Sequence, residues 1–200
     1  MIPSKIVLGT KNRDKLRELK ALLRGSRIRV LSLKDFPACP GVRENGRTFE
    51  SNARKKAAFY SRHTKLPTLA DDSGLNVNVL NGKPGVYSAR FAGPGCAYAD
   101  NNRKLLRLLQ GKKSRRARFA CVIAIYDDGN FIETVKGECR GRIAFEEKGK
   151  NGFGYDPVFI PDGFSKTFAE LPRSVKNRIS HRGKALRLAK QVILKYFKKR

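Results

Sequence analysis

Apolar residues recur along the first part of the chain in two alternating patterns. The short run KIVLG (5–9) is typical of a buried strand, whereas NRDKLRELKALLRG (12–25) carries leucines at helical spacing. Asn12 suits the N-cap of that helix, and Gly25 suits its stop. RIRVLSL (27–33) predicts a second strand. This alternation of strand and helix favours an α/β fold.

The same alternation continues in the middle of the chain. TFESNARKKAAFYSRHT (48–64) predicts a helix whose apolar side chains form one stripe. PTLA (67–70) predicts a strand, and LNVNVL (75–80) alternates as a half-buried strand does. NNRKLLRLLQG (101–111) predicts a third helix, closed by its final glycine.

The last part of the chain adds a hairpin and a long helix. ARFACVIAIYD (117–127) is nearly all apolar, which predicts a central strand covered on both faces. DDG (127–129) then turns the chain into a hairpin partner, NFIETVKGECRGRIAF (130–145). RGKALRLAKQVILKYFKKR (182–200) predicts an amphipathic helix. We therefore expect a mixed central sheet with flanking helices, in a single domain spanning 1–200 with two lobes.

The charge of the chain stands apart from this ordinary pattern. Its 44 Lys and Arg face only 17 Asp and Glu, giving a formal charge of +27. Such a field attracts polyanions, so a nucleic-acid or polyphosphate partner is one explanation. A basic surface adapted to the host's cytoplasm, with no dedicated partner, is the other. The densest basic cluster is GKKSRRARF (111–119).

Other features bear on the compartment. No apolar run approaches the roughly 20 residues that a membrane helix needs, and the first residues lack a signal-peptide apolar region. The four cysteines show no zinc spacing, so we expect reduced thiols. The sequence thus predicts a cytoplasmic protein with no membrane contact.

The segment GTKNRDK (9–15) is the first candidate binding site. A helix N-terminus presents unpaired N–H groups and a positive dipole end, which suit phosphate. Lys15 opposes that dipole from the first helical turn, and a bound polyphosphate would explain its position. The segment lacks the glycines of a P-loop. A capped helix with solvated lysines is the alternative.

Glu44, Asn52 and Lys56 form the second candidate. Asn52 and Lys56 are four residues apart and share a helix face close to the apolar stripe. A lysine lining a substrate cleft would explain this position. Snorkelling of the Lys56 side chain toward solvent is the alternative.

Asp71 and Asp72 follow a predicted strand, at the place where open α/β sheets bind ligands. Two buried carboxylates side by side would repel each other unless a cation joined them. Mg²⁺ prefers oxygen ligands and combines one or two carboxylates with substrate phosphates. A carboxylate near the metal can also deprotonate water. An Asp-Ser-Gly turn is the alternative.

Two later segments suggest a purine pocket. NGFGYDPVF (151–159) offers an aromatic stacking face with a nearby acceptor, and SVKNRISHRGKA (174–185) gathers donors just before the last helix. Aromatic side chains that fill the core are the alternative for the first segment. A structural role is the alternative for His181, and we expect His63 at the surface.

Taken together and in order, these segments resemble the inosine/xanthosine triphosphate pyrophosphatase family, from about Lys5 to Leu188. The motifs that carry the resemblance are VLGTKNRDKLREL, TFESNARKKA, LADDSGLNVNVLNGKPGVYSARFAG, GFGYDPVF, KTFAEL and KNRISHRGKAL. The resemblance implies an α/β fold with a substrate cleft between two lobes, and a homodimer. It implies Mg²⁺-dependent hydrolysis of ITP, dITP and XTP to the monophosphate and pyrophosphate, which clears them from the nucleotide pool.

The resemblance also assigns site residues by position. Asp72 is implied as proton acceptor, and Glu44, Asp71 and Asp72 as metal ligands. The implied substrate contacts are Thr10, Lys11, Asn12, Arg13, Asp14, Lys15, Lys56, Ser73, Phe153, Gly154, Tyr155, Asp156, Lys176, His181 and Arg182. Donors such as His181 and Arg182 would donate hydrogen bonds to the 6-oxo group of hypoxanthine, whereas adenine's amino group would leave them unpaired.

Three positions depart from the family pattern. Lys11 replaces a usual glycine, Ser51 stands where an acidic residue usually precedes Asn52, and Asn78 replaces an acidic residue. The last two changes lower the negative charge expected near the metal, so we expect weaker metal affinity with activity retained.

Two other functions are compatible with parts of the sequence. A non-catalytic nucleic-acid binder would use the charge but gain nothing from clustered carboxylates. A hydrolase of modified pyrimidine nucleotides would not need the purine-pocket segments. Non-specific contact with nucleic acid remains an expectation of the +27 charge.

Overall fold

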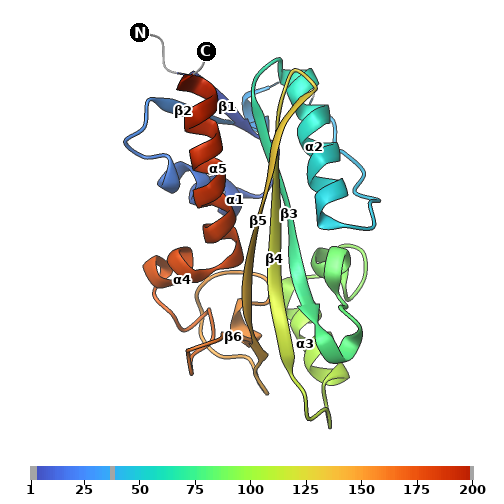
Figure 1. Ribbon diagram of the computed structural model, residues 1–200. Helices are drawn as coiled ribbons and strands as arrows, with labels where there is room; N and C mark the ends of the chain where they lie inside the picture. Colours follow the sequence, from blue (N-terminus) through green and yellow to red (C-terminus); the bar gives the residue numbers. More distant parts are fainter. Residues whose placement is uncertain (1–3, 37–38, 199–200) are drawn as a thin grey trace. The chain divides into compact units, whose positions relative to one another are not determined.

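Six strands form one mixed sheet in the order β2-β1-β3-β4-β5-β6 (Figure 1). The computed structural model describes residues 4–36 and 39–198, apart from the side chain of Arg13. The strands are β1 Ser4–Leu8, β2 Ile28–Ser32, β3 Thr68–Val77, β4 Arg116–Asp127, β5 Asn130–Ile143 and β6 Phe159–Pro161. β1 runs parallel to β2 and β3, whereas β5 and β6 are antiparallel. The expected α/β fold with a mixed sheet is confirmed.

All four predicted helices form, and the described residues add a fifth α-helix. They are α1 Arg13–Leu22, α2 Phe49–Thr64, α3 Tyr98–Leu108, α4 Arg173–Ile179 and α5 His181–Lys198. Short 3-10 helices are η1 Leu33–Asp35, η2 Asn78–Leu80, η3 Gly85–Arg90 and η4 Asp156–Val158. Asn12 caps α1 as predicted, by accepting hydrogen bonds from two backbone N–H groups of the first turn. The sequence did not predict α4, and α5 begins at His181 rather than after it.

The chain folds into two compact units that share strands β3, β4 and β5. Unit 1 comprises Met1–Asp72, Cys121–Gly137 and Lys184–Arg200; unit 2 comprises Ser73–Ala120 and Glu138–Gly183. Each unit has its own apolar core.

In unit 1, helices cover both faces of the sheet. One core joins β1, α1 and α5 with Leu69 of β3 and with Cys121, Ile123 and Ile125 of β4. Another joins α2 with Ala70 of β3 and with Val122 and Ala124 of β4. Because successive strand residues point to opposite faces, α1 and α5 lie on one face and α2 lies on the other. β4 is covered on both faces in this unit, as its apolar sequence predicted.

In unit 2, one core gathers aromatic and aliphatic side chains from β3, α3, β4, β5 and the segment 155–171. Phe119, Phe159 and Phe168 lie in mutual contact there, with ring centroids 4.6–6.2 Å apart. Tyr155 belongs to the same core. Its burial fixes the chain on either side of it, including the glycine-rich loop before it.

The expected break between two strands at residues 71–74 is wrong. β3 runs without interruption from Thr68 to Val77, straight through Asp71 and Asp72, and no Asp-Ser-Gly turn forms. Both carboxylates are therefore in mid-strand rather than at a strand end. Partners from two different helices, described below, compensate their charge.

The hairpin between β4 and β5 forms where the sequence predicted it. Asp128 and Gly129 connect the strands, with φ of 45° and 84°. Positive φ at both positions matches a two-residue type I′ turn, which follows the natural twist of the two strands.

All four cysteines are free thiols. Cys121 and Cys139 are buried, whereas Cys39 and Cys96 are partly exposed. Among the described helices, none has the length and apolarity to cross a membrane.

Candidate active site

Asp71 and Asp72 are neighbours in β3, so their side chains point to opposite faces of the sheet. Asp71 shares the face of Leu69, which packs with α1, and Asp72 shares the face of Ala70, which packs with α2. The two carboxylates therefore do not lie side by side as expected. Each pairs with a lysine of the helix that covers its face.

Asp71 pairs with Lys15 of α1. The Lys15 ammonium lies 2.9 Å from Oδ2 of Asp71, and the two side chains are only 15% and 4% exposed. The Cys121 thiol lies 3.9 Å from the same oxygen. This ion pair accounts for a cation in the first turn of α1, where the helix dipole disfavours one.

Asp72 belongs to a polar network with α2 and the loop before it. The Asn52 amide donates to Oδ2 of Asp72 at 2.9 Å, and the Lys56 ammonium lies 4.0 Å from Oδ1. Lys56 also donates to Glu44 at 2.7 Å. Lys56 is only 7% exposed. Its ammonium thus lies between two carboxylates, and the snorkelling alternative is wrong.

Asn52 ties the loop that carries Glu44 to the strand that carries Asp72. Its side-chain oxygen accepts the Gly46 N–H at 2.8 Å while its amide nitrogen donates to Asp72. A Cβ on Gly46 would come within 2.0 Å of the Ser51 hydroxyl and 2.6 Å of the Asn52 side-chain oxygen. Glycine is therefore required at this close approach.

Burial and charge shift two pKa values in this network. Burial alone lowers the pKa of Lys56, but the carboxylates of Asp72, Asp71 and Glu44 outweigh it, so the pKa is raised. Burial raises the pKa of Asp72, and the opposing effects of Lys56 and Asn52 do not cancel it. A carboxylate that holds a proton more readily than usual suits a general base.

The donor set has the chemistry of a site for a hard divalent cation. Glu44, Asp71 and Asp72 offer carboxylate oxygens, the ligands that Mg²⁺ prefers. Within residues 4–36 and 39–198, however, no three acidic, histidine or cysteine side chains are grouped closely enough to hold a metal. The three carboxylates form ion pairs with the ammonium groups of Lys15 and Lys56 instead. The residues thus fit a cation chemically, in competition with Lys15 and Lys56.

The N-terminal turn is a capped helix start. The Asn12 side-chain oxygen accepts the N–H groups of Asp14 and Lys15, and the Thr10 hydroxyl accepts that of Asn12. The Asp14 carboxylate pairs with Arg17 at the surface. Two N–H groups that the sequence offered to phosphate are therefore already used by Asn12.

Lys11 and Arg13, also predicted in this turn, have no described contact with the candidate site. Lys11 is exposed, and the side chain of Arg13 lies outside the described part of the chain.

Of the departures from the family pattern, Ser51 is exposed on α2, and its hydroxyl donates to the Thr48 carbonyl. Asn78 is exposed in η2 of unit 2.

In unit 2, Asp156 organises the glycine-rich loop. It is 3% exposed, and its Oδ2 accepts the Phe153 N–H at 2.8 Å and the Lys176 ammonium of α4 at 2.5 Å. Lys176 lies 4.7 Å from the centroid of the Phe153 ring. Asp156 therefore positions Lys176 against that partly exposed ring.

Arg182 and Ser73 are brought together at the same unit. Arg182, in the first turn of α5, donates to the Ser73 hydroxyl of β3 at 2.8 Å. Its guanidinium carbon lies 5.4 Å from the Phe153 ring centroid. Phe153, Lys176, Arg182 and Ser73 thus form one cluster, as the resemblance implied for the substrate end.

Tyr155 and His181 have core contacts instead. The Tyr155 hydroxyl donates to the Ser88 carbonyl at 2.9 Å, and its burial raises its pKa. The His181 ring stacks on Phe119 with centroids 4.5 Å apart. The core-filling alternative is confirmed for Tyr155, and His181 supports the first turn of α5 from within the core. His63 is exposed, as predicted.

The sequence analysis missed one supporting asparagine, Asn102, and gave Asn52 no role beyond sharing a helix face with Lys56. Asn102 of α3 is 2% exposed, and its amide donates to Glu147 and to the Gly154 carbonyl, both at 3.2 Å. In both cases, a polar amide among the apolar residues of a helix could have indicated a buried asparagine that hydrogen-bonds to the site.

Comparison with known proteins places these features in a family. A model of the Ham1 family matches residues 6–192. A dITP/XTP pyrophosphatase of Desulfotalea psychrophila is 49% identical over 186 residues, which cover 93% of this chain and 83% of that protein. One of Desulforamulus reducens is 49% identical over 94% of this chain and 95% of its own.

Solved structures agree with this comparison. A HAM1 protein of Coxiella burnetii matches with a TM-score of 0.88 and 41% identity, over 96% of this chain and 99% of its own. The Staphylococcus aureus Ham1 protein matches with a TM-score of 0.88 and 36% identity, over 96% and 100% of the two chains. With its fold, its motifs and this similarity along nearly its whole length, the chain belongs to the Ham1 family.

Proposed function

We propose that this protein hydrolyses dITP, ITP and XTP between the α- and β-phosphates, releasing the nucleoside monophosphate and pyrophosphate. The observation that carries the proposal is the network that joins the buried side chains of Asp72, Lys56 and Asn52 to the partly exposed Glu44. Relatives named dITP/XTP pyrophosphatase support the substrate class.

In this proposal unit 1 performs the reaction. Asp72 accepts a proton from the attacking water, and its raised pKa makes it a stronger base than an ordinary aspartate. Asn52 orients the Asp72 carboxylate through their hydrogen bond. Lys56 and Lys15 contribute positive charge for the phosphate groups, after exchanging part of their carboxylate contacts for substrate oxygens.

We further propose Mg²⁺ as the divalent cation, held by Glu44 and Asp72, the two carboxylates around Lys56. Asp71 points to the opposite face of β3 and pairs with Lys15, so it is not a ligand in this proposal. The carboxylate chemistry of Glu44 and Asp72 supports this assignment. When bound, such a cation neutralises phosphate charge and polarises the phosphoryl oxygens. Nucleotide pyrophosphatases generally need a divalent metal, which agrees with the proposed Mg²⁺ site.

Unit 2 would bind the base. Phe153 offers a partly exposed ring, and Lys176 and Arg182 are donors held beside it. Hypoxanthine and xanthine carry a 6-oxo acceptor that such donors match. Adenine places an amino donor at the same position and would leave the donors unpaired, which costs free energy in a buried site.

Hydrolysis of ITP in ¹⁸O-labelled water tests the proposed bond cleavage. Attack at the α-phosphorus puts the label into IMP and releases unlabelled pyrophosphate, which ³¹P NMR and mass spectrometry resolve. Label in orthophosphate, or release of orthophosphate with IDP, would contradict the proposal.

The remaining expectations extend this proposal. We propose a homodimer in the cytoplasm, acting as one functional domain over residues 1–200. The match of the Ham1 model to 6–192 supports one domain, and four free thiols agree with a reducing compartment.

A further inference from the structure

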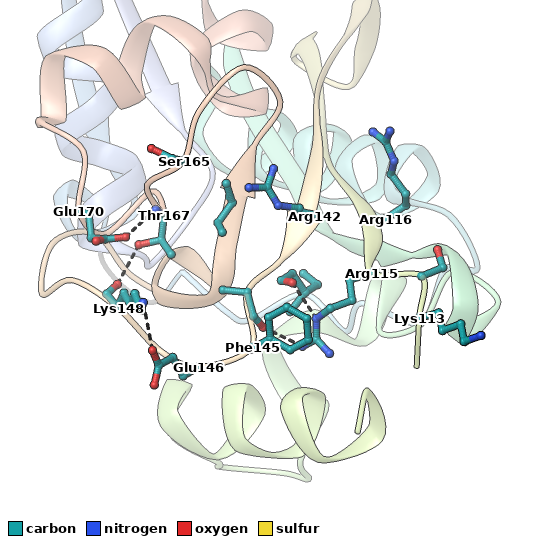
Figure 2. Close-up of a pocket in the computed structure, with 14 residues that line it drawn as sticks. Lys113, Arg115, Arg116, Arg142, Phe145, Glu146, Lys148, Ser165, Thr167 and Glu170 are labelled. Atoms are coloured by element: carbon teal, nitrogen blue, oxygen red, sulfur yellow. Dashed lines mark hydrogen bonds and ion pairs between the residues drawn. The ribbon is translucent and has the colours of Figure 1, made fainter. Parts of the chain in front are cut away.

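A cavity of about 700 Å³ opens in unit 2, and the residues that line it differ from those assigned to the base (Figure 2). Its walls come from the start of β4, the end of β5 with the residues that follow, and the segment around Thr167. None of the site residues that the resemblance assigns lines it, although Thr167 and Glu170 belong to the KTFAEL motif. The cavity lining includes part of GKKSRRARF, the densest basic cluster of the sequence.

The lining of this cavity is strongly basic. Its cations are Lys113, Arg115, Arg116, Arg142 and Lys148, and its only carboxylates are Glu146 and Glu170. Glu146 pairs with Lys148 at 3.0 Å, and Glu170 accepts the Thr167 N–H at 2.7 Å. The cavity therefore keeps a positive excess that an anion can neutralise.

Arg115 is a buried residue of this wall, fixed by several hydrogen bonds. It is 8% exposed, and its guanidinium donates to the carbonyls of Ile143, Leu109 and Ala144 at 2.7–3.0 Å. All three acceptors are neutral. Within the described residues, neither Arg115 nor its neighbours Lys113 and Arg142 has an ion pair with a carboxylate. The buried charge of Arg115 is thus fixed in place without a counter-charge.

An exposed aromatic ring lies directly beside that charge. Phe145 is 84% exposed, the highest value for a large apolar side chain among the described residues. Its ring centroid lies 4.6 Å from the guanidinium carbon of Arg115. Figure 2 shows the Phe145 ring beside Arg115, with Arg142 above it and Lys148 to its left in this view. A ring with most of its surface exposed offers a stacking platform for a flat partner.

We propose that this cavity, from Lys113 to Phe145 and Lys148, binds single-stranded nucleic acid. An unpaired base stacks on Phe145, and flanking phosphates contact Lys113, Arg142 and the edge of Arg115. Stacked aromatics within a basic groove are how proteins bind single strands without reading sequence. A duplex keeps its bases paired and cannot offer one to Phe145. This binding is independent of the hydrolytic site.

Fluorescence anisotropy with a labelled oligothymidine of twelve nucleotides tests the proposal. It contains neither purine nor triphosphate, and EDTA in the buffer prevents turnover. The test variant is Phe145→Ala with Arg142→Gln. The matched control is Phe131→Ala with Arg24→Gln, because Phe131 is also exposed beside an arginine and Arg24 is an exposed cation of unit 1. Both variants lose one aromatic ring and one positive charge.

The proposal expects the test variant to bind at least roughly tenfold more weakly, with the control within about twofold of wild type. The test variant should also lose about 0.7 from the slope of log affinity against log salt. Wild-type protein should prefer the single strand to the duplex with oligodeoxyadenosine. Equal losses in both variants, or equal affinity for the duplex, would show diffuse charge attraction and overturn the proposal.

Two controls exclude other occupants. If thymidine monophosphate displaces the oligomer at an equal concentration of nucleotides, the cavity is a mononucleotide site and the proposal is wrong. If the test variant changes the oligomeric mass measured by light scattering, the cavity is an interface between copies of the chain. ITP hydrolysis should be the same in both variants, so a failure of binding here is separable from a failure of the proposed reaction.

Discussion

At the scale of residues, two adjacent aspartates have different surroundings because a strand sends them to opposite faces. Asp71 forms a nearly buried ion pair with Lys15, whereas Asp72 joins Asn52, Lys56 and Glu44. Like-charge repulsion between them is reduced by this separation and by one lysine on each face. Asp72 is therefore the better candidate for the proton acceptor.

Replacing Asp72 by Asn should abolish turnover and leave the fold intact. The amide retains the size and a hydrogen bond to Asn52 but cannot accept a proton, so kcat should fall by about 10²–10⁴-fold. Steady-state kinetics with ITP and circular dichroism measure the two effects. Asp128→Asn is the matched control, since Asp128 is an exposed hairpin residue. A near wild-type rate for Asp72→Asn would remove Asp72 from the proposed role.

Replacing Lys15 by Ala should raise KM for the triphosphate and also destabilise the protein. Removing one partner of a buried pair leaves the other charge uncompensated, which costs about 3–5 kcal/mol. Adding Asp71→Asn should recover much of that loss in thermal unfolding without lowering KM. If KM stays at the wild-type value in Lys15→Ala, Lys15 serves only as the partner of Asp71.

At the scale of elements, the periodicity of apolar residues predicted the helices and strands that the local sequence determines. The helical spacing of leucines located α1, and the unbroken apolar run located β4. The continuity of β3 could not be predicted, because Asp, Ser and Gly are depleted in strands and favoured in turns. The charges of Asp71 and Asp72 are compensated by Lys15 and Lys56, which are distant from them in sequence. Long-range pairing overrode local propensity there.

The candidate site shows the same division between local and long-range information. The family motifs identified Asp72, Lys56 and Glu44, which the structure brings together. The pairing of Lys15 with Asp71 depends on which face of β3 α1 covers, and no local pattern contains that information. Nor could the sequence distinguish Tyr155, which fills the core, from the partly exposed Phe153 in the same loop.

The loop that contains Gly152 should be intolerant of a side chain. A Cβ there would lie 2.0 Å from Oδ2 of Asp156, the atom that holds Lys176. Gly152→Ala should therefore lower the melting temperature and raise KM for ITP. Gly163→Ala is the control, because its φ of 81° nearly equals the 80° of Gly152, with no atom within 4 Å of its Cβ. Equal effects of both changes would reduce the role of Gly152 to backbone strain.

At the scale of the whole molecule, the charge of +27 works against folding. Like charges repel more in the compact state than in the expanded chain, and salt screens this repulsion over about 8–10 Å at physiological ionic strength. The melting temperature should therefore rise between 20 and 300 mM NaCl. A melting temperature that falls with added salt would show that the ion pairs outweigh the repulsion.

The central claim is the hydrolysis of non-canonical purine triphosphates with a divalent cation. We would measure pyrophosphate release from ITP, XTP, ATP, GTP and dTTP, with Mg²⁺ and with EDTA. We predict release that requires Mg²⁺ and favours ITP and XTP over ATP and dTTP, because the donors at Phe153 match a 6-oxo purine. Release from none of the five, or equal release from ATP and dTTP, would contradict it.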